Sequence, residues 1–178
     1  WWYRTTGASA TGSWNFGNNK VRFYTNSGAT GSLRMMTNSL TALDVYLGSA
    51  GAANNNATLE LGSGTHSVRS LSKAYDGTVT GTLSLLMGSS TLNCTGDINL
   101  TGISVTESTS TLNLTGTYAQ EITTLLNKFN NVNFSGAGPF NIKGNFSAAG
   151  AVVVESKAIN CSGDFIISQS FTPATSTV

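Results

Sequence analysis

Carboxylate pairs are the first chemistry to consider, because an enzyme that cleaves polysaccharides usually works with two of them. Asp97 and Asp164 stand in matching motifs, Cys94-Thr-Gly-Asp and Cys161-Ser-Gly-Asp. A repeat with a period of 20 residues places these acids about three coils apart, on the order of 14 Å. Glycosidase carboxylates lie closer, at about 5–5.5 Å or 6.5–9.5 Å. We therefore interpret both acids as turn residues that follow a glycine, and we expect no catalytic pair.

Histidine and cysteine are too scarce for most other sites. The single histidine, His66, follows Gly62-Ser-Gly-Thr, so we interpret it as a surface residue of a turn and expect neither a metal site nor a catalytic triad. Cys94 and Cys161 are also about three coils apart, beyond the Cα separation of about 7 Å that a disulfide spans. The sequence predicts two buried free thiols, no metal, no cofactor and no catalytic residue, and hence a protein that is not an enzyme.

The element that must position these residues is a short pattern with a period of 20. It reads Leu92-Asn-Cys-Thr-Gly, then Leu112-Asn-Leu-Thr-Gly, then Val132-Asn-Phe-Ser-Gly, with Val152-Val-Val in the next place. A fixed period near 20 in short strands is typical of a solenoid. Strand alternation then predicts an interior row made of Leu92, Cys94, Leu112, Leu114, Val132, Phe134, Val152 and Val154.

The opposite parity predicts two outward ladders. Asn93, Asn113 and Asn133 should form an amide ladder, beside a hydroxyl ladder of Thr95, Thr115 and Ser135. The same alternation generates Asn-x-Ser/Thr triplets, the acceptor pattern for N-glycosylation, without requiring that modification. These triplets begin at Asn56, Asn93, Asn99, Asn113, Asn133, Asn145 and Asn160.

A second column predicts a further strand in each coil. Leu100-Thr-Gly, Ile142-Lys-Gly and Cys161-Ser-Gly share one form, and Ile122 fills the coil between the first two. Each coil then has at least two strands that meet at a glycine corner. Further expectations are a turn at 17–19, a loop at 48–56, a strand at 92–100 and a helical turn at 120–130. Residues 40–47 could form a short helix or a strand, and Asp44-Val-Tyr favours the strand.

Composition narrows the class of protein. Charged residues are 10% of the chain, against about 25% in ordinary soluble domains, and the formal net charge is +1. This charge gives no reason to expect nucleic acid, and the absence of an 18-residue apolar run predicts no membrane span. The chain begins at Trp1 without a Met or a signal peptide, which favours a processed chain or a section of a larger one. Residues 1–57 are less regular and are interpreted as the first coils, and residues 58–178 as the regular solenoid.

Two stretches resemble a known kind of repeat. Phe129-Asn-Asn-Val-Asn-Phe-Ser-Gly-Ala-Gly-Pro-Phe-Asn-Ile-Lys-Gly-Asn-Phe and Trp14-Asn-Phe-Gly-Asn-Asn-Lys-Val-Arg-Phe are similar to repeats of very large secreted bacterial surface proteins. These proteins include adhesins and filaments of the filamentous-haemagglutinin-like kind. The resemblance covers about 12–25 and 80–167, and residues 30–56 do not follow it. It implies a β-solenoid stalk, export, surface attachment and adhesion, with no catalytic residues.

The sequence thus predicts an all-β, right-handed parallel β-helix of about eight or nine coils, with 20–22 residues per coil and a length of some 40 Å. We expect a rigid, non-catalytic section of an extracellular bacterial filament or adhesin. Its expected partners are copies of itself, neighbouring segments of a longer chain, or cell-surface glycans. The alternative is a β-helix that binds or degrades carbohydrate, such as a phage tailspike section.

Overall fold

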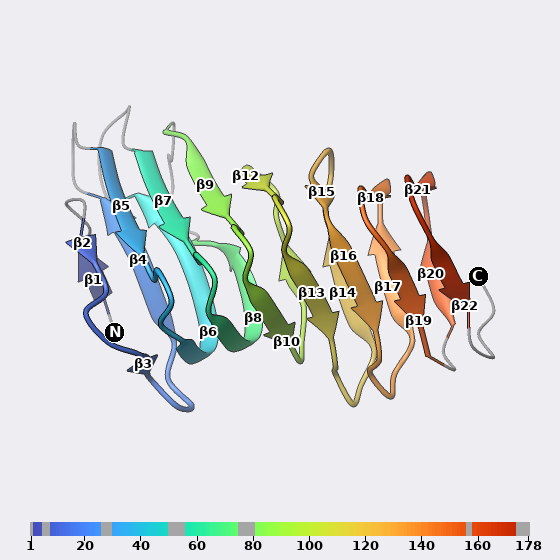
Figure 1. Ribbon diagram of the computed structural model, residues 1–178, viewed down its shortest axis with the longest axis horizontal. Helices are drawn as coiled ribbons and strands as arrows, with labels where there is room; N and C mark the ends of the chain where they lie inside the picture. Colours follow the sequence, from blue (N-terminus) through green and yellow to red (C-terminus); the bar gives the residue numbers. More distant parts are fainter. Residues whose placement is uncertain are drawn as a thin grey trace.

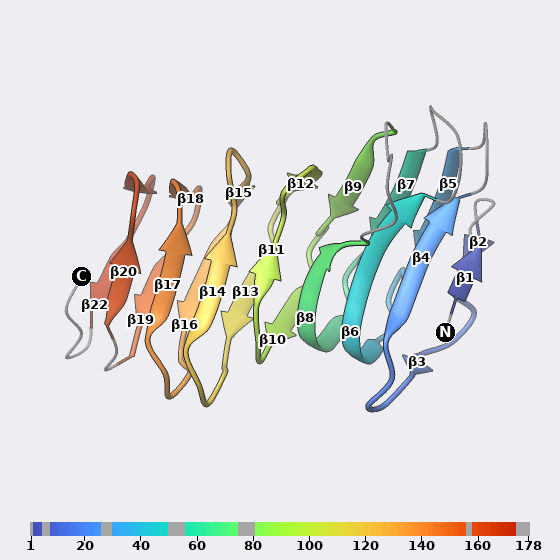
Figure 2. The ribbon, with the colours of Figure 1, turned by 180° about the vertical axis from the view of Figure 1, so that it is seen from behind.

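The computed structural model describes residues 2–4, 8–25, 30–49, 56–74, 81–155 and 158–173. These residues form strands, turns and bends, without a helix, and every strand pair is parallel. Each turn of the chain lies beside the last along the long axis (Figure 1). The strands nearest the viewer in Figure 1 run downward, and those seen from behind in Figure 2 run upward, while the chain advances from N- to C-terminus. The coil is therefore a right-handed parallel β-solenoid, as predicted.

Each coil has three sides. The first side holds one ladder of eight rungs, in which β6 and β8 take part with their first halves. Its strands are β3 (Trp14–Asn15), β6 (Leu40–Ser49), β8 (Thr65–Lys73), β10 (Thr91–Cys94), β13 (Thr111–Leu114), β16 (Asn131–Phe134), β19 (Val152–Val154) and β22 (Phe171–Pro173). The register from β10 to β19 is the one that the period of 20 predicted. All eight predicted interior residues of this side are buried.

The second side belongs to the same large sheet, because β6 and β8 bend round the corner between the two sides (Figure 2). Besides the second halves of β6 and β8, it holds β1 (Trp2–Arg4), β4 (Val21–Thr25), β11 (Ile98–Asn99), β14 (Gln120–Thr123), β17 (Phe140–Lys143) and β20 (Ile159–Cys161). Ile122, Ile142 and Cys161 stack as predicted. The residue that stacks on Ile122 is Ile98, and Leu100 lies two places further on, so the predicted column was wrong at that coil.

The third side is divided between two sheets. A five-stranded sheet comprises β2 (Ala8–Ser9), β5 (Thr30–Arg34), β7 (Asn56–Glu60), β9 (Leu83–Leu86) and β12 (Ile103–Thr106). A three-stranded sheet continues with β15 (Lys128–Phe129), β18 (Phe146–Ala148) and β21 (Phe165–Ile167). Its strands are shorter, and the stacked rings of Phe146 and Phe165, 4.8 Å apart, fill the interior behind them.

Coil length changes near the middle of the chain. Along the first side, Trp14, Leu40, His66 and Leu92 succeed one another every 26 residues. From Leu92 onward the step is 20 residues, and the last step, from Val152 to Phe171, is 19. The predicted length of 20–22 residues thus holds only for the later coils. The earlier coils are longer partly because the third side there uses strands of up to five residues.

Three local predictions need correction. Residues 120–130 form β14 and β15 with a turn between them instead of a helical turn, because Gln120 and Ile122 face the interior of a strand. Residues 92–100 form two strands, since the chain turns a corner at Gly96. The predicted strand at 40–47 is confirmed as part of β6, and the turn at 17–19 is a coil corner. The predicted loop at 48–56 was wrong at both ends, because Gly48 and Ser49 are the last residues of β6 and Asn56 begins β7. Residues 50–55 lie outside the described part of the chain.

Candidate functional site

The two matching Cys-x-Gly-Asp motifs do not meet. Asp97 lies just before β11, at the corner between the first and second sides. Asp164 lies just before β21, at the corner between the second and third sides. Three ladder steps separate β11 from β20, the strand that leads to Asp164. The two carboxylates are on different corners of different coils and do not form a pair.

His66 lies in the core, and its predicted place on the surface was wrong. It is an inward residue of β8, stacked between Leu40 and Leu92, and it is fully buried. The Nδ1 atom accepts a hydrogen bond of 3.2 Å from the backbone N–H of Leu40, so Nε2 carries the proton and donates to the carbonyl oxygen of Leu61 at 3.0 Å. Burial lowers the pKa of His66 from its ordinary value of 6.5. Both ring nitrogens are therefore engaged by backbone groups of the core.

Both cysteines are free thiols, as predicted. Cys94 is buried, and burial raises the pKa of its thiol to about 12, which keeps it protonated and unreactive. The predicted burial of Cys161 was wrong: this residue also has inward parity, but it is only partly buried because it lies in the last described rung of the second side.

A hollow forms where the corner between the first and second sides is short. Leu40 and Val45 lie five positions apart, as do His66 and Leu71, so β6 and β8 turn this corner without a loop. The next corner is almost as short, with six positions from Leu92 to Ile98. The corner is longer before these three coils, at residues 16–20, and much longer after them, where ten positions separate Leu112 from Ile122. Three coils with a tight corner therefore lie between two projecting loops, at the lower edge of Figure 1.

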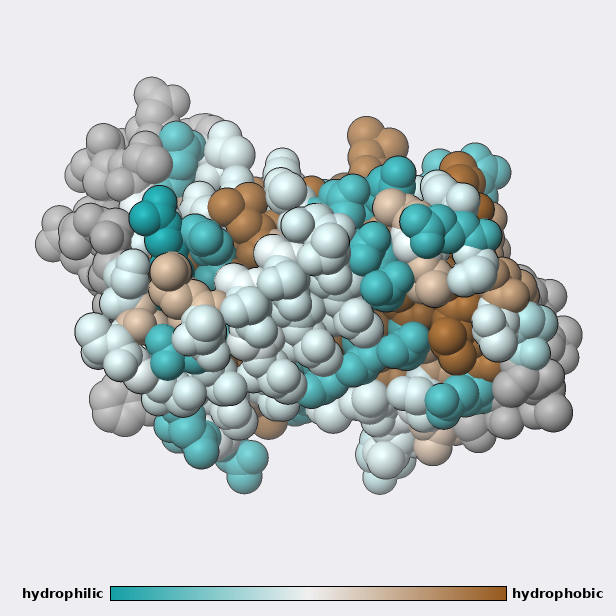
Figure 3. Space-filling view, in the orientation of Figure 1, coloured by the Kyte–Doolittle hydropathy of each residue, from teal (hydrophilic) through white to brown (hydrophobic). Residues whose placement is uncertain are grey.

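We call this region the corner trough, and it consists of two hollows that share Arg69 and Thr95. One, of about 290 Å³, runs along the first side from Gly17 to Asn93. The other, of about 440 Å³, runs along the second side and ends at Tyr118 and Ala119. Figure 3 shows the lower edge of the molecule recessed between two projections at this place.

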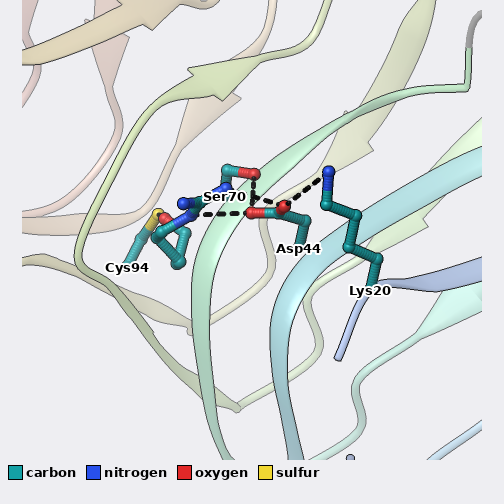
Figure 4. A network of polar contacts seen from close by, with 5 residues as sticks. Lys20, Asp44, Ser70 and Cys94 are labelled. Carbon is teal, nitrogen blue, oxygen red and sulfur yellow. Dashed lines mark hydrogen bonds and ion pairs between the residues drawn. The ribbon is translucent and has the colours of Figure 1, made fainter. Parts of the chain in front are cut away.

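A buried charge lies under the floor of the trough. The side chain of Asp44 is 1% exposed, yet it accepts hydrogen bonds from Nε of Arg69 at 2.9 Å, from Nη2 of Arg69 at 2.7 Å and from Oγ of Ser70 at 2.7 Å. Nζ of Lys20 lies 3.8 Å away. Figure 4 shows Lys20 and Ser70 directed at the carboxylate of Asp44, with dashed lines for the contacts. The arrangement satisfies a charge that would be costly to bury alone, and it fixes the guanidinium of Arg69, which is about half exposed, in one orientation.

The C-terminal wall of the trough is also fixed. Buried Gln120 accepts a hydrogen bond from the N–H of Gly116 at 2.8 Å and donates one to the carbonyl of Gly96 at 2.6 Å. On the outside, Asp97 accepts a hydrogen bond from the N–H of Glu121 at 2.8 Å. The loop 116–119 is therefore attached to the preceding coil on both faces, and it presents Tyr118 with 84% of its surface exposed.

The outward ladders of the first side are present. Nδ2 of Asn113 donates to Oδ1 of Asn93, and Nδ2 of Asn133 donates to Oδ1 of Asn113, each at 2.8 Å. Thr95, Thr115 and Ser135 stand next to them in register and are exposed. The predicted amide ladder is confirmed and binds coil to coil on the outside, while the row of hydroxyls remains available to solvent.

A larger hollow lies on the third side, where the five-stranded sheet ends and the narrower coils begin. It measures about 760 Å³, and its lining includes Leu83, Ile103, Val105 and the exposed Leu125 and Leu126. Its lining side chains are apolar or uncharged, so no titratable group of the lining lies beside the hydroxyls of Thr82 and Ser104.

Within the described residues, no group of three or more His, Cys, Asp or Glu side chains could hold a metal ion. The same residues contain no helix long and apolar enough to cross a membrane. No protein-family model matches the chain, and comparisons with curated proteins and with solved structures found no match.

Proposed function

We propose that this chain is a rigid, non-catalytic section of an extracellular filament or adhesin. The observation that carries the proposal is the ladder of eight rungs on the first side, which continues from β3 to β22. Seven steps of about 4.8 Å give a rod of roughly 34 Å in which backbone hydrogen bonds run along the axis. Pulling along this axis loads many of these bonds together, as a stalk requires.

The outer surface supports the same role. The first side presents Thr, Ser and Asn in rows, and the face seen in Figure 3 is pale over β9, β10 and β13, the colour of intermediate hydropathy. Such a surface carries little charge, so neighbouring rods would repel one another weakly. The Asn93–Asn113–Asn133 ladder adds side-chain bonds between coils where the strands are short.

A carbohydrate-degrading role has less support. Asp97 and Asp164 lie at different corners, and the buried Asp44 has both carboxylate oxygens occupied by Arg69. A glycosidase would need one carboxylate able to give up a proton next to another within reach of the same bond.

Immunogold electron microscopy of intact source cells tests the proposed function. Antibodies raised against the purified chain should label fibres or protrusions outside the cell, and permeabilising the cells should add little label. Label that appears only after permeabilisation would contradict the extracellular role. Label spread evenly through the medium without attachment to fibres would contradict the stalk.

A further inference from the structure

We propose that the corner trough binds a neutral saccharide chain, with Tyr118 as the aromatic platform and Arg69, Asp97 and Asn99 as the polar contacts. The second hollow of the trough brings these four side chains together from three successive coils. A sugar ring has an apolar C–H face and a rim of paired hydroxyl groups. An exposed aromatic ring beside planar groups that bond in pairs matches both features.

Arg69 can donate hydrogen bonds to a ligand, because its hydrogen bonds to Asp44 use only some of its N–H groups. A guanidinium has five N–H groups, and the contacts with Asp44 involve Nε and Nη2. The side chain is 53% exposed, while Asp44 beneath it is 1% exposed. The ligand would therefore meet a donor whose position is already set and whose charge is already balanced, which lowers the ordering cost of binding.

The trough wall is equally preorganised. The next coil carries a matching loop, in which the N–H of Ala137 donates to the carbonyl of Gly116 at 2.7 Å. Gly138 packs so closely on this wall that a Cβ there would lie 2.2 Å from the backbone carbonyl carbon of Tyr118. Together with Gln120 inside, this contact leaves Tyr118 on a backbone that cannot fold away from the hollow. A largely preformed site is what small-molecule binding favours.

The charges and strands of the trough disfavour other ligands. Lys20 and Arg69 balance the two carboxylates Asp44 and Asp97, so the trough has no net positive charge that would favour phosphate or sulfate. An added peptide strand is also disfavoured, because β6, β8 and β10 are each paired on both sides. A neutral polyhydroxylated chain lying along the axis fits both constraints.

Isothermal titration of the whole chain with cellohexaose, maltohexaose, chitohexaose and an acidic control, hexagalacturonate, tests the proposal. We expect at least one neutral hexasaccharide to bind and the acidic one to bind more weakly. Absence of binding by all neutral members at millimolar concentration, or binding of hexagalacturonate alone, would overturn it.

Variants locate the site. Tyr118→Ala should weaken binding about tenfold, and Tyr118→Phe, which keeps the ring, should stay within about twofold. Gly138→Ala should weaken binding by moving the wall, and Leu126→Ala, an exposed apolar residue outside the trough, should change nothing. Undiminished binding by Tyr118→Ala would refute the assignment. The location of the chain on cells is measured independently of saccharide binding, so a negative result in one experiment leaves the other unaffected.

Discussion

At the scale of single residues, two stacked serines give a matched test of hydrogen bonding in the core. Ser90 and Ser110 occupy equivalent, buried places just before β10 and β13. Oγ of Ser110 donates to the carbonyl of Glu107 at 2.6 Å, whereas Oγ of Ser90 has no partner in the described structure. An unpaired buried hydroxyl costs about 1–3 kcal/mol, and a made hydrogen bond contributes about 1 kcal/mol.

The two alanine substitutions should therefore change the free energy of unfolding in opposite directions. Ser90→Ala should raise the free energy of unfolding by about 0.5–1 kcal/mol, and Ser110→Ala should lower it by about 1 kcal/mol. Urea denaturation followed by circular dichroism measures both. Equal losses in the two variants would show that Ser90 has a partner, such as a water molecule, in solution.

The buried imidazole of His66 should make the stability of the chain depend on pH. Its folded pKa is lowered, so as the pH falls below 6.5 the unfolded chain binds a proton before the folded chain does. The free energy of unfolding should therefore fall as the pH decreases below 6.5, until the folded pKa is reached. The slope for one proton is at most about 1.4 kcal/mol per pH unit.

The comparison with His66→Gln isolates this effect. Glutamine can also accept and donate a hydrogen bond, but it does not titrate. Denaturant melts of both proteins from pH 7.5 to 5 should show the difference in stability shrinking as the pH falls. A difference that stays constant with pH would mean that the folded and unfolded chains bind protons to His66 equally well.

At the scale of elements, the corner between the third and first sides repeats one backbone conformation. Met36, Gly62, Gly88 and Ser108 each have a positive φ, between 49° and 71°, and they follow at steps of 26, 26 and 20. At Gly88 (φ 62°) an added Cβ would also lie 2.3 Å from the carbonyl oxygen of Gly62. This corner is therefore restricted by both its conformation and the coil before it.

Gly88→Ala should lower the free energy of unfolding by about 2 kcal/mol or more, from strain and from the displaced coil. Gly12→Ala is the matched control, because an added Cβ there meets nothing within 4 Å, and it should change stability by less than about 0.5 kcal/mol. Thermal melts of the two variants measure the contrast. Similar melting temperatures would show that the corner can relax.

The residues of the first side show which coils could be predicted from the sequence and which could not. The later coils were predictable because Leu92, Leu112 and Val132 are followed by the same Asn, hydroxyl and Gly residues. The earlier coils were not, because Trp14 and His66 fill positions where leucine stands in other coils. In the sequence, the period of 26 is visible only in the turns of small residues that follow Gly62 and Gly88.

The corner trough was beyond sequence reasoning for a related reason. Asp44 and Arg69 are 25 residues apart in the sequence, and their contact can be predicted only if the length of that coil is known. The hollow itself depends on differences between corner lengths, and these appear only after both columns are aligned. The buried Asp44 in an alternating apolar strand was the signal that could have drawn attention to the region.

At the scale of the whole molecule, a solenoid should tolerate loss of a complete coil, because each coil contacts only its neighbours. Deleting residues 112–131 joins Thr111 to Val132 and lets Val132 stack on Leu92, with Ile142 on Ile98. Both columns and the parity of every later strand are preserved. We expect a folded protein that unfolds cooperatively at a somewhat lower temperature and is shorter by about 5 Å.

Deleting only residues 112–121 is the control, since half a coil would place second-side residues against the first side and disrupt the ladder. The 20-residue deletion should keep the circular dichroism signal of β structure. The 10-residue deletion should show a weaker signal, because the strands from β13 onward would not form. Small-angle scattering measures the change in length. If both deletions unfold the chain, the coils form one indivisible core. The stability of the chain would then not be the sum of contributions from single coils and their neighbours, as a stalk of stacked repeats requires.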